Sequence, residues 1–275
     1  MPFAVSQDRR IYYERHGSGP TVLFLHGAGS NAATWWQQVP EFSKSHTCLT
    51  MDIRCFGRSS APVSEFVLAH FVADVLAVLE QERVDRVALI GQSLGGMIGF
   101  RLAITHPELV VGFIACDTSL AIDHPVLVES VDRRFKNVSA VSIEQRSLGA
   151  WFIKTSPELA GLYAQINHFN PSAHSIDADA WREAMLTLNE PVNLAPLAAI
   201  EKLRCPTLFL VGAEDPIVPA HVMHELSQAV PGSEVLVLAE AAHSAYFEKP
   251  GEFNRAVLSF LARRIYAAES QATLG

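Results

Sequence analysis

Apolar runs and amphipathic stretches alternate along much of the chain. Runs without polar alternation, such as residues 87–90, suit strands that are buried on both faces of a parallel sheet. Residues 65–81 instead repeat apolar side chains at helical spacing. Because strands that alternate with helices are typical of parallel sheets, the pattern predicts an α/β fold with a mostly parallel central sheet. Strands are expected at residues 3–5, 11–15, 21–25, 47–52, 87–90, 110–116, 207–211 and 235–238.

Helices are expected between these strands. One should cover residues 32–43 and turn Trp35, Trp36 and Val39 toward the core. Another should follow Ser93 and end before Pro107, because a proline disfavours helix in the residue that precedes it. The last helix is expected at residues 252–267, and the tail after it has a loose composition.

The alternation lapses between Asp117 and the strand at 207–211. This interval is far longer than a crossover needs, and it contains helical patterns at 125–135, 143–153, 157–168 and 178–188. Because an insertion at the carboxyl end of a strand lies over the active site, residues 119–203 are predicted to form a helical lid (cap), and residues 1–118 and 204–275 the core domain.

Large apolar residues of this lid are candidates for contact with a substrate. Phe135, Trp151 and Trp181 are expected to bind it, while packing inside the lid is the alternative for each of them, as for Phe152 and Phe169.

The run at 87–90 ends on Gly91-Gln92-Ser93-Leu94-Gly95, which matches G-x-S-x-G. In this turn the serine takes a strained conformation at the top of a sheet, and the flanking glycines avoid collisions with the neighbouring strand and helix. Ser93 is therefore the candidate nucleophile, and a plain turn serine is the alternative.

A serine nucleophile needs a histidine base and a carboxylate that orients it. Asp215 follows the strand at 207–211, and His243 lies in a small-residue loop after the last strand. Ser93, Asp215 and His243 are therefore the expected catalytic residues. Asp117 competes with Asp215, because it also ends a strand, and a turn role for Asp215 is a further alternative.

The loop after the third strand, residues 26–31, is expected to supply part of an oxyanion hole. Its small residues let the backbone approach a substrate carbonyl. We assign the N–H groups of Ala28 and Leu94 as the donors. A turn that caps the next helix through Ser30 or Asn31 is an alternative that can hold at the same time.

Composition narrows the function classes. The chain has 275 residues, 49% of them hydrophobic and 18% charged, which suits one large domain. A net charge of −8 without a run of basic residues argues against nucleic-acid binding. The N-terminus lacks a signal pattern, and no apolar run is long enough to cross a bilayer.

The cysteines and histidines favour a cytoplasmic enzyme without a cofactor. Cys48, Cys55, Cys116 and Cys205 are scattered, which favours free thiols in a reducing compartment. His221 and His224 stand three apart without a third ligand, so we expect no metal. The expected partner is a small-molecule acyl substrate, with no nucleic acid or membrane, and a homodimer is left open.

With these features the chain resembles enzymes of the α/β-hydrolase fold over nearly its whole length, most closely 3-oxoadipate enol-lactonases and small carboxylesterases. The resemblance lies in GQSLGGMIG, DIRCFGRSS, CPTLFLVGAEDP and EFNRAVLSFL. It implies Ser93 as nucleophile, Asp215 as acid, His243 as base, and Ala28 with Leu94 as oxyanion donors. The implied activity is hydrolysis of a small ester or lactone through an acyl-enzyme.

The resemblance has one local departure, at Cys55, where the D-x-R-G-x-G-x-S pattern has a glycine. This departure puts the backbone geometry there in question. Other activities share the same triad: hydrolysis of carbon–carbon bonds in ring-cleavage products, cofactor-free perhydrolase or oxygenase chemistry, and ligand reception without catalysis.

Carbon–carbon hydrolases resembling this chain have an H-G-x-G-P-G loop and a tryptophan shortly after the catalytic histidine. The chain has neither, since Ser30 and Asn31 end the loop and no tryptophan follows His243. Arginines of the lid could pair with a substrate carboxylate, although solvation is the more common fate of such residues. They are Arg133, Arg134, Arg146 and Arg182.

Overall fold

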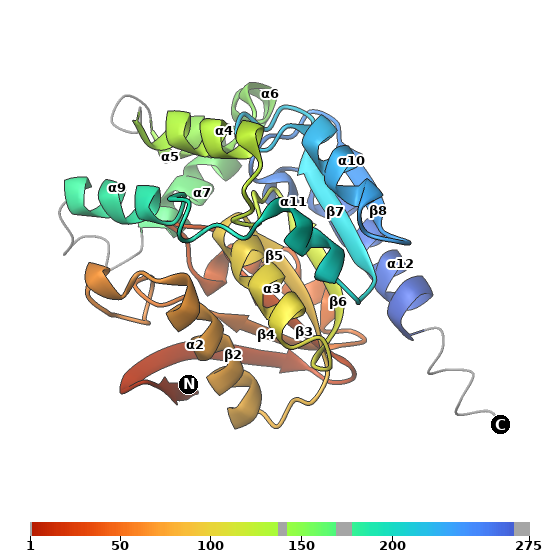
Figure 1. Cartoon of the computed structure of the whole chain (residues 1–275). Coiled ribbons are helices and arrows are strands. Elements are labelled where there is room, and N and C mark those ends of the chain that lie inside the picture. The colour runs from red at the N-terminus through yellow and green to blue at the C-terminus, as the bar shows by residue number, and fades with distance from the viewer. Residues whose placement is uncertain (1, 137–141, 169–177, 267–275) are drawn as a thin grey trace.

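The computed structural model describes residues 2–136, 142–168 and 178–266. Within these residues the strands form one sheet in the order β1-β2-β4-β3-β5-β6-β7-β8 (Figure 1). β1 and β2 run antiparallel to their neighbours, and the other strands are parallel. All the expected strands are present, and the α/β fold is confirmed. They are β1 (Phe3–Ser6), β2 (Arg9–Gly17), β3 (Thr21–Leu25), β4 (Thr47–Met51), β5 (Val87–Gln92), β6 (Val110–Cys116), β7 (Thr207–Gly212) and β8 (Glu234–Leu238).

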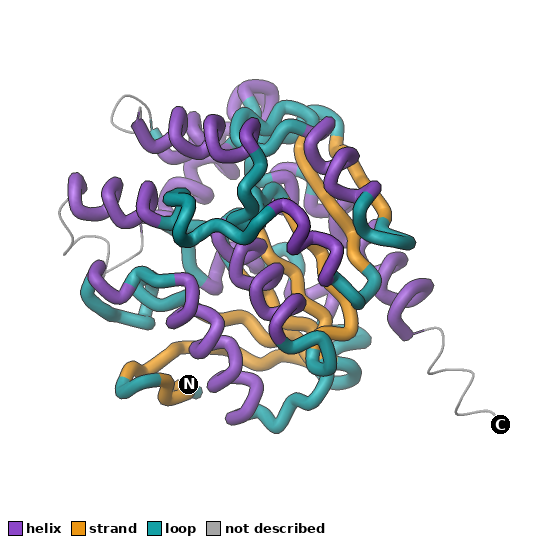
Figure 2. The backbone as a smooth tube through the Cα atoms, in the orientation of Figure 1, coloured by secondary structure: helices purple, strands orange, loops and turns teal. Residues whose placement is uncertain are grey.

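Helices cover both faces of the sheet, which explains why β5 is buried along its whole length. One face packs against α2 (Leu68–Gln81), α3 (Leu94–Thr105) and α10 (Ala220–Gln228). The other face packs against α12 (Pro250–Phe260) and the short α1 (Val39–Phe42) (Figure 2). The chain crosses from β4 on one side of β3 to β5 on the other, and ligands bind at the carboxyl ends of strands beside such a reversal.

The α-helices between β6 and β7 stand above the carboxyl ends of the parallel strands, whereas the 3₁₀ helix that precedes β7 lies beside the sheet (Figure 1). We call residues 119–203 the helical insertion. The expected helix at 143–153 is divided, because Leu148 is extended and Gly149 begins a new helix as its N-cap. Phe169 lies outside the described residues. The helices are α4 (Pro125–Lys136), α5 (Ile143–Ser147), α6 (Ala150–Thr155), α7 (Pro157–His168), α9 (Ala178–Thr187) and the 3₁₀ helix η4 (Leu197–Lys202).

The expected helix at 32–43 is also divided, into a 3₁₀ turn η1 (Ala32–Trp35) and α1. Pro40 explains the break, since it donates no N–H and its ring would collide with the carbonyl of Trp36 in a continuous helix. Trp35 is fully buried, whereas Trp36 is 43% exposed, so the expected inward orientation of Trp36 is wrong.

The end of the chain also differs from a single helix. α12 stops at Phe260 and a π-helical turn, η5 (Leu261–Tyr266), continues it. The tail after residue 266 lies outside the described residues. In the described part of the chain, no helix combines the length and apolarity needed to cross a membrane.

Cys55 has a φ of +73°, the left-handed conformation that glycine adopts without strain. Cys55 thus adopts the backbone conformation for which the related pattern has a glycine. Its neighbour Arg54 is buried and donates to Asp74 at 2.6 and 2.9 Å and to Glu65 at 2.7 Å. A buried bidentate ion pair of this kind fixes the loop that holds the strained residue.

Candidate active site

Ser93 sits on a strained turn between β5 and α3, with φ of 51° and ψ of −111°. A side chain at Gly95 would place its Cβ 2.1 Å from the carbonyl oxygen of Leu25, so the close approach of helix and sheet requires glycine there. Two hydrogen bonds hold the turn: Ser93 N–H donates to Cys116 O at 3.0 Å, and Thr118 Oγ1 donates to Ser93 O at 2.7 Å. The side-chain oxygen of Ser93 is thereby presented at the top of the sheet.

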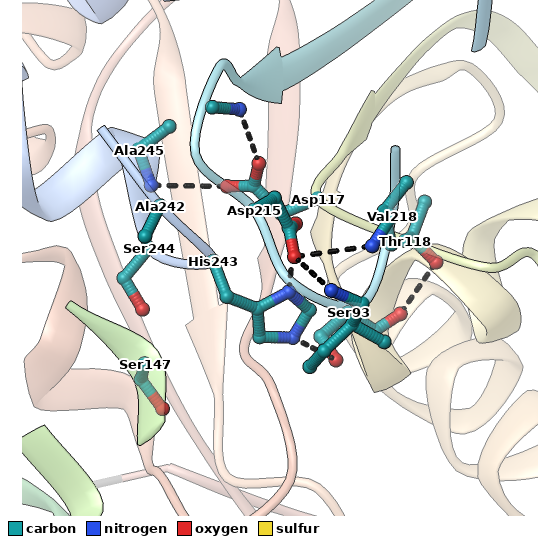
Figure 3. A network of polar contacts seen from close by, with 12 residues as sticks. Ser93, Asp117, Thr118, Ser147, Asp215, Val218, Ala242, His243, Ser244 and Ala245 are labelled. Atoms are coloured by element: carbon teal, nitrogen blue, oxygen red, sulfur yellow. Dashed lines mark hydrogen bonds and ion pairs between the residues drawn. The ribbon is translucent and has the colours of Figure 1, made fainter. Parts of the chain in front are cut away.

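Ser93, His243 and Asp215 form a hydrogen-bonded line (Figure 3). The distance from Ser93 Oγ to His243 Nε2 is 3.0 Å, and that from His243 Nδ1 to Asp215 Oδ2 is 2.9 Å. The other oxygen of Asp215 accepts from the N–H groups of Ile217 at 2.8 Å and Val218 at 3.1 Å. Because a carboxylate only accepts, Nδ1 carries the imidazole proton and Nε2 is free to accept the hydroxyl proton of Ser93.

Asp117, the competing acid, has a different set of partners (Figure 3). Its two carboxyl oxygens accept from Gly212 N–H at 2.8 Å and from Ala245 N–H at 3.0 Å. Burial, together with the nearby charge of Asp215, raises the pKa of Asp117 well above its ordinary value. The side chain thus ties the end of β7 to the segment after His243, and the structure brings Asp215 to the imidazole instead.

Two side chains that the sequence analysis did not single out also hold the His243 segment. Gln92 Nε2 donates to His243 O at 2.7 Å, and Glu248 Oε1 accepts from Ala242 N–H at 2.9 Å. In the sequence, the position of Gln92 next to Ser93 indicates that its side chain lies close to the catalytic residues. No comparable signal exists for Glu248, because its partners depend on how the loop folds back.

The assigned oxyanion donors lie beside Ser93. Leu94 is the first residue of α3, where the N–H has no acceptor within the helix, and Ala28 lines the cavity above Ser93. In the described ranges neither N–H donates to a protein acceptor. Asn31 also caps η1 by accepting from Ala33 N–H at 3.0 Å, so the loop serves as a helix cap as well.

A cavity of about 130 Å³ opens over Ser93 and His243. Phe135 and Trp181 line it, and the Trp181 ring packs edge-on against Phe56 with the ring centres 5.1 Å apart. Trp151 does not line it, which corrects our expectation for this residue. It is 44% exposed, and Lys249 Nζ lies 4.4 Å from its ring centre. The helix α6 buries Phe152 in its place.

His221 and His224, weighed as metal ligands, are both exposed on α10. Among the residues that the structure describes, no three histidine, cysteine, aspartate or glutamate side chains gather as a metal site would require.

Glu248 is expected to make stability fall as the pH rises. Its side chain joins Ala242 to Gly149 of the helical insertion, whose N–H it accepts at 2.7 Å. Burial raises its pKa from 4.5 to about 7. The folded protein therefore holds the carboxyl proton of Glu248 more tightly than the unfolded chain does. The protonated Glu248 contributes fully to the free energy of unfolding below pH 4.5, and this contribution is lost as the pH rises through 7. At about 1.4 kcal/mol per pH unit, the free energy of unfolding falls by about 3 kcal/mol over that interval.

Urea unfolding between pH 5 and 8 tests this expectation. The Glu248→Gln variant should lack this pH-dependent loss, so its curve should be flatter than that of the wild type. Glu240→Gln is the matched control, because Glu240 is exposed and pairs with Lys249 at the surface. Parallel curves for wild type and Glu248→Gln would contradict the assignment.

The chain is similar to known proteins both in sequence and in structure. Residues 20–250 match the sequence profile described as alpha/beta hydrolase fold. The chain is 26% identical over 264 residues to 3-oxoadipate enol-lactonase 2 of Acinetobacter baylyi, with 94% of this chain and 95% of that one covered. It is 28% identical over 258 residues to the pimeloyl-[acyl-carrier protein] methyl ester esterase of Aeromonas hydrophila, with 91% of this chain and 99% of that one covered.

Among solved structures, the fold is similar to that of Est816, described as an N-acyl homoserine lactone degrading enzyme. The TM-score is 0.81 at 25% identity, and the match covers 94% of this chain and 100% of that one.

Proposed function

Because the chain belongs to the α/β-hydrolase fold family, we propose that it is a serine hydrolase that cleaves a small carboxylic ester or lactone. The observation that carries the proposal is the hydrogen-bonded line from Ser93 through His243 to Asp215 at the floor of a cavity. An activated nucleophile needs this arrangement of hydroxyl, imidazole and carboxylate.

In the first half-reaction, Ser93 Oγ attacks the substrate carbonyl carbon while His243 Nε2 takes the hydroxyl proton. Asp215 holds the imidazole in the required tautomer and stabilises its positive charge. The N–H groups of Ala28 and Leu94 donate to the developing oxyanion. The carbon–oxygen bond of the ester then breaks, His243 returns the proton to the leaving alkoxide, and an acyl group remains on Ser93.

In the second half-reaction, water takes the place of the alcohol. His243 removes a proton from the water as it attacks the acyl carbonyl, and the same two N–H groups stabilise the second oxyanion. Collapse breaks the bond to Ser93 Oγ, which recovers its proton from His243, and the acid leaves. Side chains and water supply every proton, so the reaction needs neither a metal nor a cofactor.

The cavity supports a small substrate. A cavity of about 150 Å³ accepts benzene, so the cavity of about 130 Å³ suits a short acyl group. The two relatives described above act on an enol-lactone and on a methyl ester by name, which supports the choice of ester and lactone bonds. All four cysteines are free, which supports our expectation of a cytoplasmic, reducing location.

A panel of short-chain p-nitrophenyl esters and γ-lactones tests the proposed function. We expect turnover of acetyl and butyryl esters with a burst of p-nitrophenol as the acyl-enzyme accumulates. A purified protein that ignores all of these substrates, yet cleaves a vinylogous 1,5-diketone from a ring-opened catechol, would show that the triad serves carbon–carbon hydrolysis instead. A protein that binds esters without turnover would be a receptor.

A further inference from the structure

Arg134 brings a positive charge into the cavity that the proposed mechanism does not use. It lies on the inner face of α4, in line with the buried Leu127 and Val131, and it lines the cavity with its partly buried side chain. Its guanidinium donates to the backbone oxygen of Arg146 at 2.7 Å and to Ser147 Oγ at 3.2 Å. Both acceptors are neutral, and within the described ranges no carboxylate pairs with Arg134.

The other arginines of the helical insertion differ in their surroundings. Arg133 is exposed and pairs with the carboxylate of Glu129 at 3.6 Å. Arg182 also lines the cavity, but it is exposed and pairs with the carboxylate of Asp179 at 3.0 Å. Arg146 is partly buried and lines the cavity together with Arg134. None of the described residues that line the cavity is acidic, so its charged side chains are all basic.

The position of Arg134 is costly for a cation. Burial lowers its pKa to about 10, although Tyr163 and Asp215 oppose the change. The guanidinium therefore stays charged at neutral pH, in a place where a buried charge is stabilised chiefly by an opposite charge. A guanidinium has five N–H donors, and two hydrogen bonds to neutral oxygens leave donors available to a further acceptor.

We propose that this cavity selects acyl substrates that carry a free carboxylate and that Arg134 binds that carboxylate. The inference rests on the proposed function and names the substrate class of the same site. A guanidinium matches a carboxylate through two parallel N–H···O bonds, which lends specificity as well as affinity. Because the cavity is small, we narrow the substrate class to half-esters or lactones of short dicarboxylic acids.

Two phenyl esters test the proposal: phenyl hydrogen glutarate and phenyl pentanoate, which differ in a carboxylate at the place of the terminal methyl group. The wild type is expected to show a kcat/KM about tenfold or more higher for the glutarate ester, mainly through a lower KM, because charged hydrogen bonds are the strong ones. The Arg134→Met variant should lose this preference. Arg133→Met, the matched control from the exposed face of α4, should keep it.

A structural role of Arg134 gives a different result. If the side chain only braces α5, its removal lowers kcat/KM for both esters together and leaves their ratio unchanged, which would overturn the proposal. Arg134→Lys, which keeps the charge, should retain part of the preference. A second measurement needs no variant: glutarate should inhibit wild-type hydrolysis of phenyl pentanoate more strongly than pentanoate does, and equal inhibition contradicts the proposal.

The two proposals fail in distinguishable ways. Equal turnover of both esters by the wild type overturns the carboxylate preference and leaves the serine hydrolase in place. Absence of turnover for both esters overturns the proposed function itself.

Discussion

Replacement of Ser93 by alanine is expected to lower kcat for ester hydrolysis by about 10⁴-fold or more. The change removes only Oγ, the atom that attacks the carbonyl carbon and lies 3.0 Å from His243 Nε2. Without it, only substrate binding and the oxyanion donors remain, and these leave a small residual rate over water. Steady-state kinetics on p-nitrophenyl butyrate measure the loss.

The Ser93→Ala protein should remain folded. The hydrogen bonds that hold the turn use the backbone N–H and carbonyl of Ser93, and alanine adds no new Cβ strain at its positive φ. Ser119→Ala is a suitable control, since Ser119 lines the same cavity, while the described hydrogen bonds of the His243 imidazole go to Asp215 and Ser93. Equal melting temperatures with a kcat within tenfold of the wild type would remove Ser93 from the nucleophile role.

The sheet was predictable because its buried strands are mainly apolar runs, although β4 includes the buried Thr47 and Thr50. β5 has no polar side chain before Gln92, and its short length and the glycine turn that follows favour a strand buried on both faces. The helix expected at 32–43 failed for a local reason that is visible in the sequence, since Pro40 fits only the first turn of a helix and α1 accordingly begins at Val39. Trp36 follows the last residue of η1 and is exposed instead of facing the core.

The helical insertion was less predictable, because its helices pack on one another as well as on the core. The sequence could not show that α6 buries Phe152 and leaves Trp151 at the surface under Lys249, a residue almost a hundred positions away. Arg134 did carry a signal. It follows Leu127 and Val131 at helical spacing, whereas its neighbour Arg133 falls off that face.

In the sequence, the G-x-x-D turn of residues 212–215 favours Asp215 over Asp117, but topology does not separate them, because both follow parallel strands that pair directly with each other. Both carboxyl groups therefore reach the same edge of the sheet. The three-dimensional contacts separate the two roles: the N–H groups of Gly212 and Ala245 occupy the two carboxyl oxygens of Asp117, whereas Asp215 keeps Oδ2 for His243.

Asp215→Asn is expected to lower kcat by about 10³- to 10⁴-fold. The asparagine oxygen can still accept from Ile217 and Val218, so its amide nitrogen would face His243 Nδ1 as a donor. Nδ1 would then have to accept, and the imidazole proton would move to Nε2. A protonated Nε2 cannot take the proton of Ser93, so the nucleophile loses its base while the fold persists.

Asp117→Asn should behave differently, and the pair of variants decides the assignment. The amide group would leave Gly212 N–H or Ala245 N–H without its acceptor, which costs about 1–3 kcal/mol of stability. The hydrogen bonds of His243 to Ser93 and Asp215 do not involve Asp117, so kcat should stay within about tenfold of the wild type. Urea unfolding and kcat, measured on both variants, separate a loss of stability from a loss of the base. The reverse ranking of kcat would move the acid to the end of β6.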